Sequence, residues 1–516
     1  MSKFMTLEEA VSLIADGDII WINAFSALSS PVDLNSAITR RFRQTGHPRH
    51  LSVYSSFSFG DWKVPSDVEG YICEGAVDCV VCGFFGSMPN VAAAIMENRI
   101  EGYNLPGGIM SHMIRAAAKG SKQLFSRIGL NLFVDPRIGQ YRLNPRSTRE
   151  LVTLGEEAGE VGLLYKIPKI NVALLKASYC DDRGNVSFFE EGASVDALSV
   201  AQATHRNGGK VIVQVQRMER RRMPPRTVNV PAALVDAIVI CPEQPQLTGM
   251  RGYFDYICGN YVPFGEVLRA CRDQLRGELG QVSVRNDLHR AIARRAFREM
   301  EAGQIVNVGI GIPELIADEV LDRDLLDSIH LSVESGHTGG YPLGGKAFGA
   351  AISPDTMMDM ARQFDFYEGG GLDLCFIGAL QADKEGNVNG HYTTGKLSGI
   401  GGFANITQTT KKVVFCFTFS AKGLQGTVRD GTVSITREGS IPKLTDRVSA
   451  LSFNAENARR IGQEVLYITE RCVFRLGPRG LVLTEIAPGV DLQRDILDRL
   501  SFTPEIAPEL VPMSFA

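Results

Sequence analysis

Glu334 stands at the end of a short apolar run and directly before a glycine-rich turn. The run, Ile329 to Val333, predicts a buried strand, and the turn from Ser335 to Gly340 contains three glycines that would let another molecule approach the backbone. A carboxylate is ionised at neutral pH and can act as a nucleophile without a general base. It can attack a thioester if backbone N–H groups stabilise the oxyanion. His337 therefore has no required role as a base, and we expect it in a loop or at the substrate's edge.

Three further segments predict anion-binding groups near this carboxylate. Gly309-Ile310-Gly311-Ile312-Pro313 joins a strand to a helix, so its amides and the helix N-terminus favour an anion. Gly401-Gly402 belongs to a second glycine-rich loop, and Lys422 follows another strand. Because the C-terminal ends of parallel strands line one crevice, we expect these groups to converge. The alternatives are a solvated strand-end Glu334 and a solvated loop Lys422.

The first glycine loop leaves nicotinamide-dinucleotide binding open as an alternative. The loop resembles G-x-G-x-x-G, and Glu334 follows about 20 residues later, where a ribose-binding acid is expected. The third glycine position is occupied by Glu314, which would repel a pyrophosphate. An NAD-dependent oxidoreductase is therefore the weaker interpretation.

Composition excludes several other classes of protein. The chain has 516 residues, and 54 Lys+Arg against 58 Asp+Glu give a net charge of −4, so no basic surface for nucleic acid is indicated. No apolar run approaches the roughly 18 residues that span a bilayer. Glu8 and Glu9 stand where an export signal would need apolar residues. We expect a cytoplasmic protein without membrane or nucleic-acid partners.

The cysteines and histidines do not form a metal-binding pattern. The ten cysteines are too sparse for a disulfide scaffold, and the eight histidines form no HxH or HExxH motif. The single CxxC, Cys79 to Cys82, lies in the apolar run from Ala76 to Phe85, which predicts a buried strand. The sequence therefore predicts no metal site.

The two halves of the chain repeat one pattern of strands and turns. Three pairs of segments occur in the same order: Asp18–Ile22 and Gln304–Val308, Asn171–Leu175 and Asp373–Ile377, and Lys210–Val213 and Lys412–Phe415. A tandem duplication is the simplest explanation. Alternating apolar strands and amphipathic helices predict an α/β fold with two tandem, homologous open domains and mainly parallel sheets.

We expect one domain over residues 1–275 and the other over 285–516. The polar segment from Arg272 to Gln281 is the candidate linker. The N-terminal half carries additional sequence around Leu105–Gly108 and Phe133–Arg137, and the Pro-rich tail from Thr503 is expected along the surface.

The segment from Val333 to Gly340 resembles the E-[NS]-G-x-x-G signature of family I CoA-transferases. Other segments along nearly the whole chain resemble the fused, single-chain subgroup of propionate and acetate CoA-transferases. They are Tyr103–Pro106, Phe133–Arg137, Gln363–Tyr367, Gly399–Phe403 and Ala487–Leu492. The motifs are specific in combination, although none is specific alone.

This resemblance implies a CoA-transferase that acts on short-chain carboxylic acids by a ping-pong route. Glu334 would form an acyl–glutamyl anhydride and then a glutamyl-CoA thioester. The resemblance also implies that Gly402 contacts the oxyanion and CoA, and that Gly401 contacts CoA. The Gly309–Pro313 loop would bind CoA, and Lys422 its charged portion. Coenzyme A would be a substrate, with no permanently bound cofactor, and the protein would be a homodimer or homotetramer.

Two departures from the family pattern bear on the substrate. The turn from Asn23 to Ser29 lacks the glycines of the family's G-G-F-x-G loop, and Ala404-Asn405 replaces the expected Ile-Asp. Changed walls on the acyl side would alter substrate choice while leaving Glu334 intact. Two rival functions remain open: an acyl-CoA hydrolase with the same glutamyl intermediate, and a non-catalytic acyl-CoA-binding paralogue.

Overall fold

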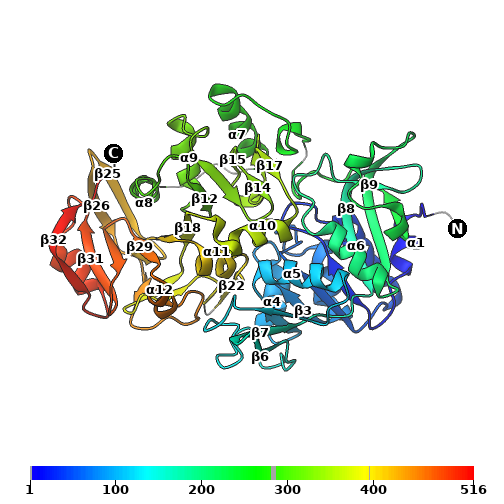
Figure 1. Ribbon diagram of the computed structural model, residues 1–516, viewed down its shortest axis with the longest axis horizontal. Helices are drawn as coiled ribbons and strands as arrows, with labels where there is room; N and C mark the ends of the chain where they lie inside the picture. Colours follow the sequence, from blue (N-terminus) through cyan, green and yellow to red (C-terminus); the bar gives the residue numbers. More distant parts are fainter. Residues whose placement is uncertain (1–2, 251, 280–285, 394, 516) are drawn as a thin grey trace.

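The structure is a computed structural model that describes residues 3–250, 252–279, 286–393 and 395–515. Two α/β halves lie side by side, the N-terminal half in blue to green and the C-terminal half in green to red (Figure 1). Each half is built on a large sheet whose central strands are parallel. The predicted α/β class with mainly parallel sheets is confirmed.

The N-terminal sheet has the strand order β11-β10-β8-β1-β2-β3-β4, all parallel, and the short β9 (Val186–Ser187) adds antiparallel to β8. The seven parallel strands are β1 (Ile19–Ile22), β2 (Leu51–Ser55), β3 (Val77–Cys82), β4 (Glu101–Asn104), β8 (Val172–Asp181), β10 (Lys210–Glu219) and β11 (Ala237–Ile240). Its helices are α1 (Leu7–Ser12), α2 (Val32–Thr45), α3 (Asp67–Tyr71), α4 (Pro89–Met96), α5 (Gly107–Ala118) and α6 (Ala197–Arg206).

The additional sequence of this half includes a small antiparallel sheet. It consists of β5 (Gln123–Ser126), β6 (Val152–Glu157) and β7 (Glu160–Lys166), in the order β5-β7-β6.

The C-terminal sheet has the order β17-β14-β13-β12-β18-β23-β29-β30-β31-β32. Its parallel centre is formed by β12 (Ile305–Val308), β13 (His330–Val333), β18 (Leu374–Gly378), β23 (Lys412–Cys416) and β29 (Glu464–Ile468). The flanking strands are β14 (His337–Thr338), β17 (Thr356–Met357), β30 (Cys472–Leu476), β31 (Leu481–Ile486) and β32 (Glu505–Pro512). Its helices are α8 (Asp287–Phe297), α9 (Glu314–Asp322), α10 (Met360–Phe366), α11 (Phe403–Thr409) and α12 (Ala455–Ile461).

The registers of the two sheets repeat each other. Ile20 pairs with Val172 in the first half, and Val306 pairs with Leu374 in the second. Val172 and Leu374 pair in turn with Lys210 and Lys412, residues that the sequence echoes match to each other. This agreement supports the tandem duplication.

The same alignment gives each β2 residue a counterpart in β13. Ile19 pairs with Ser52 of β2, and Ile305 pairs with His330 of β13. Ser52 and His330 are therefore equivalent positions. Ser56 follows Ser52 by four residues and Glu334 follows His330 by four, so Ser56 occupies in the first half the position that Glu334 occupies in the second.

The proposed linker is largely a helix. Residues Glu266–Glu278 form α7, so the candidate linker is helical from Arg272 to Glu278, while Gly280 and Gln281 lie outside the described residues. The division into domains at this segment stays a prediction. The polar composition reflects ion pairs rather than a solvated segment: Arg272 and Arg276 both contact Asp318 of α9.

One local prediction, the buried strand over the CxxC segment, is confirmed. Thr6 and Glu9 form a capping box at the start of α1, and Cys79 and Cys82 are buried in β3. All ten cysteines are free. Within the described ranges there is no group of three or more His, Cys, Asp or Glu residues that could hold a metal ion. No helix in those ranges is long and apolar enough to cross a membrane.

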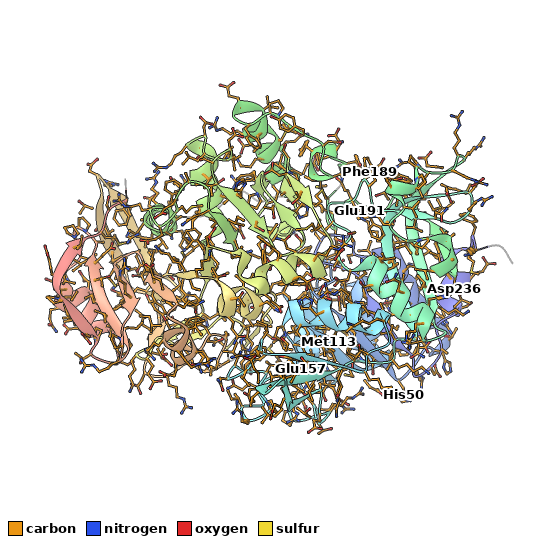
Figure 2. The ribbon with its side chains drawn as sticks, in the orientation of Figure 1. His50, Met113, Glu157, Phe189, Glu191 and Asp236 are labelled. Atoms are coloured by element: carbon orange, nitrogen blue, oxygen red, sulfur yellow. The ribbon has the colours of Figure 1, made fainter. Side chains whose placement is uncertain are left out.

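The halves meet through a shared core and through backbone hydrogen bonds. One cluster of buried apolar residues contains members of both, and side chains fill the space between them (Figure 2). The Gly107 N–H donates to the Gly401 carbonyl at 2.7 Å, and the Gly401 N–H donates to the Gly83 carbonyl at 2.8 Å. Asn104 accepts from the Ile400 N–H at 3.0 Å. The loop that carries Gly401 and Gly402 is therefore held by the N-terminal half.

Candidate active site

Glu334 lies at the C-terminal tip of β13, as the sequence predicts, and only 6% of it is exposed. Its Oε2 atom is buried and has no hydrogen-bond partner among the described residues. A methyl group built on Gly402 would lie 3.3 Å from Glu334 Oε1. The structure therefore brings together the two residues that the sequence predicts as catalytic.

A polar cluster lies below Glu334. Gln363 of α10 donates to Ser332 Oγ at 2.7 Å, and Ser332 Oγ lies 2.6 Å from Tyr367 Oη. Asn307 of β12 donates to the Ser332 carbonyl at 3.2 Å. Each of these four side chains is buried, so the cluster holds the strand tip in one conformation.

The environment of Glu334 changes its acidity. Burial raises the pKa of Glu334 to about 7, although its own backbone amide and a hydrogen bond from Asn307 oppose the shift. The carboxyl group therefore changes charge near neutral pH, in the range where a change in acidity affects reactivity.

The glycine turn after Glu334 is closed by the chain itself. A Cβ on Gly336 would lie 2.0 Å from the Met358 carbonyl oxygen, and one on Gly340 would lie 2.4 Å from the Ile352 carbonyl oxygen. Both glycines have positive φ. The expectation that this turn admits another molecule is therefore wrong, because its glycines make room for the neighbouring backbone.

His337 is not in a loop or at a substrate edge as predicted. It belongs to β14, is 1% exposed, and its Nδ1 lies 3.1 Å from Ser335 Oγ. Burial lowers the pKa of His337 to about 4, against an opposing backbone hydrogen bond at Gly192. His337 is therefore neutral at pH 7, and Ser335 itself donates to the Gly349 carbonyl.

The Gly309–Pro313 loop connects β12 to α9, at the strand end next to Glu334. The Gly309 N–H donates to the Phe376 carbonyl at 2.9 Å, and Ile310 is 44% exposed. The Gly311 N–H donates to Glu314 Oε1 at 2.9 Å. The Glu314 carboxylate thus accepts the hydrogen bond of a backbone N–H group that a pyrophosphate would need. This contact argues against dinucleotide binding.

Lys422 is exposed and follows the short strand β24 (Ser420–Ala421). It has a φ of 57°, and its carbonyl accepts from the Ser440 N–H at 3.0 Å. A buried ion pair supports the strand end before it, where Glu470 accepts from the Phe419 N–H at 2.9 Å and Arg471 stacks over the Phe419 ring. No contact among the described residues joins Lys422 to Glu334, so their convergence stays a prediction.

The turn from Asn23 to Ser29 packs beside the Glu334 region. The centroid of its Phe25 ring lies 4.2 Å from the centroid of the Phe57 ring. A Cβ on Gly349 would contact Phe25, and one on Gly401 would lie 3.3 Å from Phe57. These two rings therefore form an apolar wall from the Ser335 side of the site to the Gly402 side. We call the Phe25–Phe57 pair the aromatic wall.

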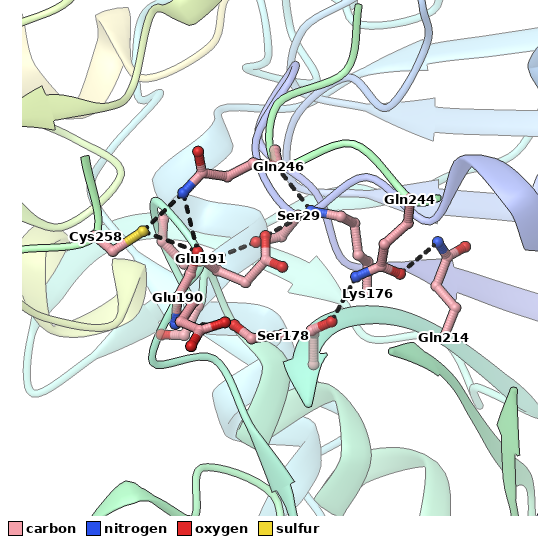
Figure 3. A network of polar contacts seen from close by, with 12 residues as sticks. Ser29, Lys176, Ser178, Glu190, Glu191, Gln214, Gln244, Gln246 and Cys258 are labelled. Atoms are coloured by element: carbon pink, nitrogen blue, oxygen red, sulfur yellow. Dashed lines mark hydrogen bonds and ion pairs between the residues drawn. The ribbon is translucent and has the colours of Figure 1, made fainter. Parts of the chain in front are cut away.

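A buried polar network lies beside Ser29, the last residue of the turn from Asn23 to Ser29 (Figure 3). Lys176 Nζ contacts Glu191 Oε2 at 2.6 Å and donates to the Gln246 carbonyl at 3.0 Å. The next residue, Leu247, forms a β-bridge with Leu28. The network thus fixes one edge of the turn from Asn23 to Ser29.

Asn405 does not stand in the aromatic wall. It is fully buried where the halves meet, donates to Glu368 Oε1 at 2.7 Å and accepts from the Gly108 N–H at 3.2 Å. The same Glu368 Oε1 atom lies 3.1 Å from His112 Nε2. An Asp at position 405 would face Glu368 with a like charge, so the amide suits this neighbour.

Sequence reasoning missed the residues that support the site from below. Asn307 is a polar residue inside the apolar strand β12, and that mismatch was its one visible signal. Ser332 gave the same signal in β13. Asp196 accepts hydrogen bonds from Ser56 and Ser111, which lie far from it in the sequence, so these contacts had no local signal.

Comparison with known proteins gives consistent matches over both halves. The family model described as Coenzyme A transferase matches residues 4–240 and 289–494. The acetate CoA-transferase YdiF of Escherichia coli K12 is 37% identical over 508 residues, which are 98% of this chain and 93% of that protein. The caffeate CoA-transferase of Acetobacterium woodii is 35% identical over 520 residues, covering 99% of this chain and 97% of that protein.

A solved structure also matches over nearly the full length. It is the acyl-CoA transferase YdiF of E. coli O157:H7 in a thioester complex with CoA. The TM-score is 0.90 at 35% identity, and the match covers 99% of this chain and 95% of that chain.

Proposed function

This chain belongs to the coenzyme A transferase family and is a CoA-transferase, and we propose that it transfers CoA between carboxylic acids through a covalent intermediate on Glu334. The observation that carries this proposal is the buried carboxylate at the tip of β13, with one unpartnered oxygen and Gly402 beside it. The thioester complex with CoA of the E. coli relative supports a covalent route.

The first half-reaction forms and breaks bonds in two steps. A Glu334 oxygen attacks the thioester carbon of an acyl-CoA, the C–S bond breaks, and CoA leaves as a thiolate, giving an acyl–glutamyl anhydride. The thiolate then attacks the glutamyl carbonyl carbon, and the donor acid leaves as a carboxylate. The product is a glutamyl-CoA thioester. An acceptor carboxylate reverses both steps, so no proton or electron is consumed.

The backbone around Glu334 stabilises the charge that develops. The oxyanion of each tetrahedral intermediate needs a nearby donor, and the Gly402 N–H is the proposed one. Losing a donor of this kind typically costs about 2.7–4 kcal/mol of transition-state stabilisation. Gly401, Lys422 and the Gly309–Pro313 loop are the proposed CoA contacts. Binding energy from the remote parts of CoA is then used at the thioester.

The aromatic wall supports a short-chain acid as substrate. Phe25 and Phe57 are both fully or almost fully buried, and they pack against Gly349 and Gly401. Such packing limits the length of an acyl group beside Glu334. A homodimer or homotetramer completes the proposal, and light scattering after size-exclusion chromatography tests it.

The direct test is the mass of the protein during turnover. Wild-type protein incubated with an acyl-CoA and no acceptor should gain the mass of CoA minus water on the peptide that contains Glu334. Glu334→Gln should gain none and should lose transfer by several orders of magnitude, because an amide is a poor nucleophile. Circular dichroism serves as the folding control.

The same experiment separates the rivals. Steady release of CoA thiol without an acceptor acid would identify a hydrolase. Tight acyl-CoA binding without an adduct, unchanged in Glu334→Gln, would identify a non-catalytic paralogue. Either result would contradict the proposed transfer.

A further inference from the structure

Asp196 is a buried carboxylate that joins three elements near the site. It is 2% exposed and immediately precedes α6. Its side chain accepts hydrogen bonds from Ser56 Oγ, at 3.0 Å, and from Ser111 Oγ. Its backbone N–H donates to Asn23 Oδ1 at 2.9 Å. The carboxylate makes no capping bond to its own helix, although a helix start is where an Asp usually does so.

Each of these partners leads to a part of the proposed transfer site. Asn23 begins the turn that carries Phe25. Ser56 follows β2 and precedes Phe57, so it adjoins the second ring of the aromatic wall. Ser111 is on α5, whose first residue, Gly107, donates to the Gly401 carbonyl.

The backbone next to Asp196 is held in an unusual conformation. Val195 has a φ of 56°, which a β-branched residue rarely adopts. Its carbonyl accepts from the Met360 N–H at 3.0 Å, the first residue of α10. That helix carries Gln363 of the cluster below Glu334. Strained backbone of this kind persists where surrounding contacts hold it, and it is common at functional sites.

The duplicated fold gives Ser56 a special position. The paired registers place Ser56 in the first half where Glu334 stands in the second. One strand tip thus presents a carboxylate toward the reaction, and the corresponding tip is tied to the carboxylate of Asp196. Ser56 thus attaches the acyl side of the proposed site to Asp196.

We propose that Asp196 is a positioning residue for CoA transfer, which holds the aromatic wall in place through Asn23, Ser56 and Ser111 and so sets the selection among acyl groups. This inference rests on the proposed function. Asp196 acts through these neighbours and does not contact the reacting atoms.

The test compares acyl selection in Asp196→Asn with that in a matched control, Asp181→Asn. Asp181 is also a buried aspartate that accepts hydrogen bonds, from the backbone N–H groups of Arg183 and Asn185 and from the Asn185 side chain, but it is the last residue of β8. The measurements are kcat and KM for a series of acceptor acids of increasing chain length, with melting temperature as the stability control.

For Asp196→Asn we expect kcat/KM with the preferred acid to fall roughly tenfold, which is the size expected for losing one hydrogen bond to a charged group. The ratio between the preferred acid and an acid one carbon longer should fall at least about threefold. A single-turnover CoA adduct should still form. Asp181→Asn should keep the wild-type selection.

An unchanged acid profile in folded Asp196→Asn would overturn the inference. The inference would also be overturned if kcat/KM fell by the same factor for every acid and that factor matched the loss of folded protein. If Asp196→Asn does not fold, Ser111→Ala and Ser56→Ala each remove one donor and are judged by the same profile. Absence of the CoA adduct in wild-type protein would instead overturn the proposed function, so the two failures are distinguishable.

Discussion

At the scale of single residues, the reactivity proposed for Glu334 depends on its burial away from solvent. The buried Oε2 has lost water without gaining a described partner, and an unsatisfied buried polar group typically costs roughly 1–3 kcal/mol of stability, more when it is charged. The same desolvation raises the pKa, so the ionised carboxylate is more basic than one in water. A cost of this kind is expected at a site where the group reacts.

The pH dependence of the first half-reaction follows from this pKa. In the proposed mechanism only the ionised form of Glu334 attacks, and burial raises the pKa of this carboxyl group from the usual 4.5 to about 7. Adduct formation at low acyl-CoA concentration should therefore fall roughly tenfold per pH unit below about 7 and level off above about 8. Rapid-quench mass analysis between pH 5 and 9 measures the rate.

Two neighbouring groups define the control for that profile. His337 has a pKa of about 4 and stays neutral throughout the range. Burial raises the pKa of Asp196 to about 6, so this carboxyl group changes charge within the same pH range. Asp196→Asn removes the second group, and its pH midpoint should match that of the wild type. A flat profile from pH 5 to 8 would show that the Glu334 carboxyl is already ionised in the free enzyme.

At the scale of elements, the turn from Asn23 to Ser29 obtains its shape without glycine. Ser26 and Ser29 adopt positive φ of 54° and 52°, and Phe25 and Leu28 exchange backbone hydrogen bonds. Ser26 Oγ lies 3.0 Å from Ser58 Oγ, and Ser29 donates to the Ala193 carbonyl. Long-range hydrogen bonds thus hold serines in a conformation that glycine would adopt at lower cost.

The two alanines of this turn have different surroundings, and this gives a specific prediction. Ala27 shares a core cluster with Phe25 and Phe57, whereas Ala24 belongs to the other cluster, together with Ile22. Ala27→Gly removes a methyl group on the side of the aromatic wall. It should raise kcat/KM for an acid one carbon longer, relative to the preferred acid, by about fivefold, within the range known for one methylene.

Ala24→Gly is the control, since it makes the same chemical change in the same turn on the other side. It should lower the melting temperature without changing the acid profile. Equal profiles for Ala27→Gly and wild type would show that this turn does not line the acyl pocket.

Local patterns predicted much of the fold, and long-range contacts explain what they missed. The strand ending at Glu334 and the repeated strand pattern are both visible in the sequence, because each depends on nearby residues. The closed turn at Gly336 depends on Met358, and the link between Asp196 and Ser56 joins residues of separate elements. The helical structure of the candidate linker was not predicted, because the arginines of α7 find their partners on α9.

At the scale of the whole molecule, the proposed site lies where the two halves meet. Glu334 and Gly402 belong to the C-terminal half, while the aromatic wall belongs to the N-terminal half. The loop of Gly402 is attached across the junction: the Phe85 N–H donates to the Ser398 carbonyl at 2.7 Å, and Gly107 and Gly83 bond to Gly401. The relative position of the halves therefore fixes the distance from the proposed oxyanion donor to the nucleophile.

Gly399 shows how closely the halves approach, and its substitution tests this dependence. A Cβ on Gly399 would lie 2.7 Å from the Gly83 carbonyl oxygen and 2.9 Å from Phe84 Cα, both backbone atoms of the other half. Gly399→Ala should push the Gly402 loop away from the N-terminal half. We expect a loss of roughly tenfold or more in kcat/KM, since small displacements in an active site can cost about a hundredfold.

Gly395→Ala separates this clash from backbone strain. Gly395 has a φ of 83°, close to the 80° of Gly399, but a Cβ there would have no atom within 4 Å. Both variants carry the same strain of a left-handed backbone conformation. A larger loss of kcat/KM in Gly399→Ala than in Gly395→Ala therefore measures the effect of the contact between the halves. Steady-state kinetics and melting temperatures of the two proteins give the comparison. Equal activities would show that the junction adapts to an added methyl group and does not control the geometry at Glu334.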